Sequence, residues 1–159
     1  MKYLITHRQE VEDVIKKMSG RVESLPYNFA NKSPMSVLKE LIDNTRKSII
    51  NKKFQKNWHE EFVTYGALAI CDIVHMNGMD ALDGFSDFIL EKHKHYGAEP
   101  FEDWKEVGII MRLGSKINRI LNLRSLDGAT YDSSIKESAN DTVKDILGYC
   151  ILGCYLYKL

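Results

Sequence analysis

Residues 134–157 read SIKESANDTVKDILGYCILGCYLY, and this stretch decides the fold. Ser134 and Glu137 have the Ser-x-x-Glu spacing in which two side chains cap each other's backbone amides, so a helix is predicted to start here. Successive residues of a helix are about 100° apart, which gathers the apolar side chains on one broad face. The members of that face are Ile135, Ala139, Val143, Ile146, Leu147, Cys150, Ile151 and Cys154. A long helix with such a face predicts an all-α fold.

An acidic stripe runs along the edge of this apolar face. Glu137, Asp141 and Asp145 recur at every fourth position, which stacks three carboxylates over roughly two helical turns. Like charges at this spacing destabilise a helix by a few tenths of a kcal/mol per pair. A cationic group is therefore predicted to face the acidic stripe, either a metal ion or the basic residues of a neighbouring helix.

Composition predicts one domain over residues 1–159. A chain of 159 residues that is 44% hydrophobic and 28% charged is large enough for a real core. Lysine plus arginine equals aspartate plus glutamate at 22 each, so no net charge draws the chain to nucleic acid or to an anionic membrane. The chain shows no signal-peptide pattern and no apolar run of about 18 residues, and its three cysteines form no Cys-x-x-Cys pair. We expect a cytoplasmic protein with reduced cysteines.

Helical periodicity and capping signals predict five further helices, at about residues 6–20, 34–50, 57–77, 79–96 and 101–123. Gly20, Gly78 and Gly97 are the predicted helix ends. The helix at 57–77 is apolar almost all round and is therefore predicted to be central. Together with the C-terminal helix, these segments predict a single bundle of five to six helices.

A basic stripe of Arg112, Lys116 and Arg119 lies beside the apolar face of the predicted helix at 101–123. A polar loop joins that helix to the C-terminal helix, so the basic and acidic stripes are predicted to lie close together. Two interpretations remain open. The stripes form interhelical ion pairs, or the carboxylates hold Mg²⁺ while the basic side chains hold phosphates, since magnesium takes a few carboxylates with water and phosphate oxygens and arginine binds phosphate bidentately.

Two further charged residues point into apolar faces, where each needs a partner. Lys92 either extends its amine into bulk water past neighbouring phenylalanines, or enters a polar cavity near Asp141 or Asp145 and binds phosphate there. Asp72 either accepts a hydrogen bond from Lys92, a tyrosine or a tryptophan, or serves as a further magnesium ligand.

Two segments of these helices carry a family resemblance. RLGSKINRILNL (residues 112–123) and KESANDTVKDILGY (residues 136–149) resemble the nucleotide modification associated domain 1 family, which is common in phage genomes. Members of that family read R-(L/I)-x-D-K-x-x-R-x-x-N-L and then D-E-S-x-x-D-T-L-x-D-L-A-x-Y. A third segment, EKHKHYG (residues 91–97), is similar to the family's K-N-x-D-Y-G. The resemblance covers about residues 88–157.

The family is in turn similar to the all-α nucleoside triphosphate pyrophosphatases of the MazG and dimeric dUTPase kind. The resemblance thus implies Mg²⁺-dependent hydrolysis of a (deoxy)nucleoside triphosphate to monophosphate and pyrophosphate in phage-type nucleotide metabolism. The predicted catalytic residues are Glu137 and Asp141. The predicted metal ligands are Glu137, Asp141, Asp145 and Asp72, and the predicted substrate-binding residues are Lys92, Tyr96, Arg112, Lys116 and Arg119.

The sequence departs from the family pattern at three acids, where it has His95, Ser115 and Lys136. A module that binds a nucleotide without hydrolysing it is therefore an alternative, and so is a helical interaction protein whose stripes are only salt bridges. The nearly all-apolar surface at 146–156 also predicts a homodimer, in which two copies bury this surface across a two-fold axis.

Overall fold

Six α-helices and one short 3₁₀ helix make up most of the computed structural model, which describes residues 8–25, 32–50, 57–96, 99–125 and 133–157, with backbone alone at 93–96, 99–106 and 133. The elements are α1 (Arg8–Val22), α2 (Pro34–Ile50), α3 (Trp58–Asn77), η1 (Met79–Leu82), α4 (Phe85–Tyr96), α5 (Glu99–Arg124) and α6 (Ser133–Leu156). The described residues form no strand, so the all-α prediction is confirmed. None of these helices, in the part of the chain described, is both long and apolar enough to cross a membrane.

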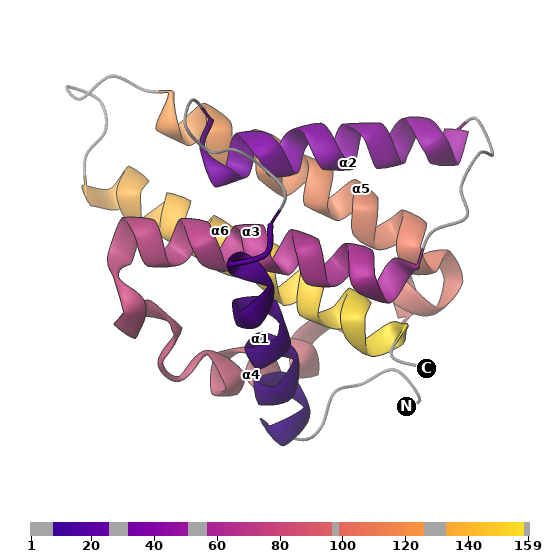
Figure 1. Ribbon diagram of the computed structural model, residues 1–159, viewed down its shortest axis with the longest axis horizontal. Helices are drawn as coiled ribbons and strands as arrows, with labels where there is room; N and C mark the ends of the chain where they lie inside the picture. The colour runs from indigo at the N-terminus through magenta and orange to yellow at the C-terminus, as the bar shows by residue number, and fades with distance from the viewer. Residues whose placement is uncertain (1–7, 26–31, 51–56, 97–98, 126–132, 158–159) are drawn as a thin grey trace.

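The central helix is α3, as its all-round apolar sequence predicts. In Figure 1, α3 and α6 lie side by side in the middle of the bundle, with α2 and α5 above them and α1 and α4 below. Phe62 of α3 is completely buried and packs edge-on against Tyr65, with 5.8 Å between ring centroids, and stacks on Tyr157 at 6.3 Å. Because α3 is apolar on several faces at once, it can contact α1, α2 and α6 together.

Capping residues fix the starts of α2 and α3 where the sequence predicts them. The Ser33 hydroxyl accepts a hydrogen bond from the Ser36 amide at 3.2 Å, and Pro34, which has no amide hydrogen to satisfy, follows as the first helical residue. The Asn57 side chain accepts from the Glu60 amide at 3.3 Å. At the other end of α3, Gly78 has a φ of +87° and closes the helix, as predicted.

Two predicted helix boundaries are wrong. Gly20 does not end α1, which continues to Val22 because Arg21 and Val22 contact the rest of the bundle. The segment 79–96 is two elements and not one helix, because Gly84 adopts a φ of +73° that a helix cannot contain. The predicted start of the first helix at about residue 6 and the predicted helix end at Gly97 lie outside the described residues.

The apolar face of α6 is buried within a single chain, under α3. Its most buried members, each at most 2% exposed, are Ala139, Val143, Ile146, Leu147, Cys150, Ile151, Leu152 and Cys154. The contact is so close that a Cβ atom added at Gly153 would lie 2.5 Å from the Phe62 ring. Most of the surface on which the homodimer prediction rested is therefore buried within one chain, mainly against α3 and α5, so that surface does not support the prediction.

Candidate functional site

Asp145 lies between two lysines that come from different helices. Lys92 of α4 places its Nζ 3.5 Å from Asp145 Oδ1, and Lys116 of α5 places its Nζ 3.3 Å from Asp145 Oδ2. The Asp145 side chain is 17% exposed, whereas those of Lys92 and Lys116 are 39% and 33% exposed. These three residues form the Asp145 cluster, and the contact of Lys116 with Asp145 confirms for one member of each stripe that the basic and acidic stripes meet.

The remaining members of both stripes reach solvent. On α5, Arg112 and Arg119 are exposed about one turn to either side of Lys116. On α6, Asp141 and Glu137 are exposed one and two turns before Asp145. Tyr96 is the last residue of α4, and its side chain is outside the described part of the structure. The Asp145 cluster thus adjoins exposed charges of both signs.

Lys92 combines features of both interpretations of its position. Its Nζ lies over the Phe88 ring, 5.4 Å from the ring centroid, so the amine packs on an aromatic face at the edge of the apolar side of α4. The amine then reaches Asp145 and not Asp141. An ammonium group near apolar side chains is costly without a partner, and the Asp145 carboxylate supplies one.

Asp72 belongs to a different charged pair. Its Oδ1 and Oδ2 atoms accept hydrogen bonds from Arg124 Nη1 and Nη2 at 2.7 and 2.8 Å, and Asp72 is 3% exposed. The predicted partners of Asp72, namely Lys92, a tyrosine or a tryptophan, are therefore wrong. Arg124 follows Lys116 by eight residues, or about 12 Å along α5, so Asp72 does not join the Asp145 cluster.

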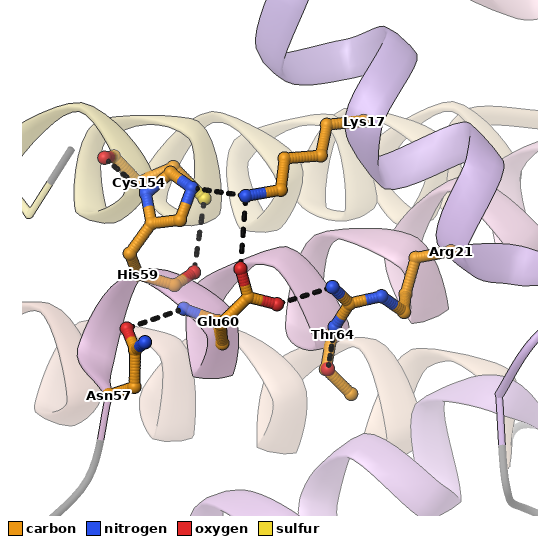
Figure 2. Close-up of polar contacts among 7 residues, drawn as sticks. All are labelled: Lys17, Arg21, Asn57, His59, Glu60, Thr64 and Cys154. Atoms are coloured by element: carbon orange, nitrogen blue, oxygen red, sulfur yellow. Dashed lines mark hydrogen bonds and ion pairs between the residues drawn. The ribbon is translucent and has the colours of Figure 1, made fainter.

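A third polar cluster, the Glu60 network, joins α1 to α3 and α6 (Figure 2). Lys17 Nζ lies 3.0 Å from Glu60 Oε1 and 2.8 Å from His59 Nε2, and Arg21 bonds both Glu60 and the Thr64 hydroxyl. The Nδ1 atom of His59 lies 3.0 Å from the Cys154 carbonyl oxygen. This oxygen can only accept, so Nδ1 carries the proton and Nε2 accepts from Lys17. The charged side chains and His59 of this network all contact one another or the backbone, which suits a role in holding α1, α3 and α6 together.

Acid is expected to weaken the Glu60 network. Hydrogen bonds from Arg21 and then Lys17 lower the pKa of Glu60 from 4.5 to about 2. A lowered carboxyl pKa contributes stability that is complete above the unfolded-state pKa and is lost as the pH falls from about 4.5 to about 2. The Glu60 side chain is 40% exposed, so solvent screening makes this contribution small.

Urea-unfolding midpoints measure this effect. The urea midpoints of the wild type and Glu60→Gln are expected to differ at neutral pH. They should converge as the pH is lowered from about 4.5 to about 2. The exposed Glu23 provides the control, because Glu23→Gln should follow the wild type throughout. A gap between wild type and Glu60→Gln that stays constant down to pH 2 would contradict the assignment.

The role of the Asp145 cluster has to be inferred from its own chemistry. No protein family, curated protein or solved structure matches this chain. Within the described residues, no three His, Cys, Asp or Glu side chains gather in one group. Magnesium needs fewer protein ligands than that, since it binds through one or two carboxylates with waters and substrate phosphates. Glu137 and Asp141, exposed on successive turns of α6, fit this minimal set, whereas Asp145 and Asp72 are engaged with cationic side chains.

Proposed function

We propose that this chain binds a nucleoside triphosphate at the Asp145 cluster and hydrolyses it, with Mg²⁺, to a monophosphate and pyrophosphate. The observation that carries the proposal is the pair of lysines from α4 and α5 that flank one half-buried carboxylate. The resemblance of residues 88–157 to a phage-type nucleotide-modification family supports the choice of a nucleotide. The exposed Arg112 and Arg119 add two cations beside the cluster.

Electrostatics favours a polyphosphate as the ligand. Two ammonium groups flank the Asp145 carboxylate, and a triphosphate carries several negative charges that these amines can bind. Lysine binds phosphate as a mobile point charge, while arginine offers a planar pair of donors. Because Lys92 and Lys116 are each about a third or more exposed, both amines can turn toward a ligand while Asp145 keeps them near each other.

The carboxylates of Glu137 and Asp141 would hold the magnesium ion, which supplies an activated water and neutralises phosphate charge. Hydrolysis adds the water oxygen to the α-phosphorus and breaks the bond between that phosphorus and the oxygen bridging to the β-phosphate. In this proposal Lys92 and Lys116 stabilise the negative charge that develops on the departing pyrophosphate. Asp145 acts on the two lysines and not on the substrate.

Nucleotide binding without hydrolysis is the second candidate. His95, Ser115 and Lys136 stand where the family pattern has aspartates, so three acids that could assist the reaction are absent from these positions. Binding through Lys92 and Lys116 needs none of them. The two candidates differ in turnover and not in the phosphate contacts.

A panel of nucleoside mono-, di- and triphosphates in a thermal-shift assay, each with Mg²⁺ or with EDTA, tests both candidates. Any nucleotide that raises the melting temperature is then incubated with the protein, and released pyrophosphate and phosphate are measured. Stabilisation with pyrophosphate release supports the hydrolase, and stabilisation without release supports the binding module. If no nucleotide stabilises the protein, both are rejected and the Asp145 cluster is an interhelical ion-pair group.

Lys92→Met is expected to weaken binding of the best nucleotide by about 1.5–3 kcal/mol, the range for a hydrogen bond to a charged group. The melting temperature should change little, because Lys92 is 39% exposed and Asp145 keeps Lys116 as a partner. Isothermal titration measures the affinity. The exposed Lys47 on α2 gives a matched control, since Lys47→Met removes the same charge elsewhere. Equal affinities for the wild type and a folded Lys92→Met protein would reject the site.

A further inference from the structure

Two clefts flank the C-terminal half of α3, on either side of one ridge. The first, of about 480 Å³, lies between α3, the start of α2 and the end of α5. The second, of about 460 Å³, lies between α3, the end of α1 and η1. Cys71 and His75 are the two residues that line both clefts, so their side chains form the ridge between them.

Cys71 and His75 have the spacing and the chemistry of a metal-ligand pair. Residues four apart on a helix have Cβ atoms about 5–6 Å apart on the same face, close enough for both side chains to reach one ion. Cysteine sulfur and histidine nitrogen are the ligands that zinc prefers. Cys71 is a free, half-buried thiol and His75 is exposed, and among the described residues neither takes part in a hydrogen bond or ion pair.

One chain supplies only half of a zinc site. Structural zinc is held by four protein ligands in a tetrahedron, often two cysteines and two histidines. Within the described ranges no third His, Cys, Asp or Glu completes a group with this pair, and the adjacent Asp72 is bound by Arg124. A second copy of the chain offers the same half-set, because a two-fold axis brings the same patch of both copies together.

We propose that one Zn²⁺ ion joins two copies of this chain, with Cys71 and His75 of each copy as its four ligands. The surface around the ridge suits a self-complementary contact. Met76 and Met79, which lie on the walls of the first and second cleft, are 43% and 74% exposed, and the opposite copy would cover them. Methionine side chains are unbranched and adapt readily to a new surface. The ridge lies on α3, whereas the residues of the Asp145 cluster come from α4, α5 and α6.

Light scattering and metal analysis of the purified chain test the proposal. The chain is expected to be a monomer after EDTA treatment and to become a dimer on addition of zinc, with one ion per two chains. Cobalt(II), used in place of zinc, should give the strong visible absorption of a tetrahedral ion and a thiolate charge-transfer band. These measurements need no nucleotide, so their outcome is independent of the proposed function.

Cys71→Ser and His75→Ala should each abolish metal-dependent dimerisation and the cobalt spectrum. Both positions lie on the surface, and thermal melting in EDTA checks that the variants are folded. Cys150→Ala removes a buried cysteine and serves as the control, since it should dimerise with zinc as the wild type does. One zinc per monomer without association, a dimer that persists in EDTA, or no zinc binding would each overturn the proposal.

Discussion

Arg124→Met is expected to lower the free energy of unfolding by about 3–5 kcal/mol, the cost of removing one partner from a buried ion pair. Asp72 is 3% exposed, and its two carboxylate oxygens accept hydrogen bonds from the Arg124 guanidinium at 2.7 and 2.8 Å. Without that group the carboxylate stays in the core of α3 with its charge uncompensated. Urea denaturation followed by circular dichroism measures the change.

The double variant Asp72→Leu with Arg124→Met separates the ion pair from simple loss of packing. Replacing both partners with apolar groups removes the buried charge, so most of the lost stability should return. Arg46, whose side chain is 48% exposed, is the control, and Arg46→Met should change stability by less than about 1 kcal/mol. A cost for Arg124→Met as small as that of Arg46→Met would contradict the buried-pair description.

Phe62→Ala is expected to cost about 3–5 kcal/mol, the usual range for a phenylalanine deleted from a core. Phe62 is completely buried, and its ring lies 6.0 Å from the Trp58 ring and 5.8 Å from the Tyr65 ring, centroid to centroid. Removing the ring leaves a cavity between α3 and α6. Chemical denaturation gives the free energy, and a cost below about 1.5 kcal/mol would mean that the surrounding side chains refill the space.

Gly153 should couple to Phe62 in a double-mutant cycle. In the wild type, Gly153→Ala is expected to cost about 1–3 kcal/mol, because the new methyl group would meet ring atoms 2.5–2.7 Å away. In the Phe62→Ala background the ring is gone, and the same methyl group should cost far less or even stabilise. Strict additivity of the two costs would show that α6 shifts away from α3 without strain.

The helices could be predicted because their signals are local in the sequence. Asn57 and Ser33 act on amides a few residues ahead, and the apolar face of α6 repeats with the helical period. The break at Gly84 was missed because the apolar periodicity of residues 79–96 continues across it, although Asp83-Gly84 is itself a turn signal. A residue that needs a positive φ interrupts a helix however well the flanking side chains fit the pattern.

The candidate site could be predicted from two signals, the charged stripes of two successive helices and a lysine at position 92 that points into an apolar face and needs an acidic partner. The contact between Lys116 and Asp145 follows from two stripes separated by one loop. Asp72 and Arg124 are 52 residues apart, and Lys17 and Glu60 are 43 apart, on helices that meet only in the folded bundle. Spacing along one helix says that such a charge needs a partner but does not say which one. For the same reason it could not reveal that α3 covers the apolar face of α6.

The contact between α3 and α6 joins two segments that leave the ribosome at different times. His59 and Cys154, which bond across this contact, are 95 residues apart. A ribosome adds about 5–20 residues per second. The residues of α3 are therefore made roughly 5–20 seconds before the residues of α6 that pack on them. During that time a helix rich in buried aromatic side chains is open to other apolar surfaces. Because α1 and α2 are made before α3 and also contact it, only the face of α3 that α6 covers is expected to stay open until α6 emerges and docks.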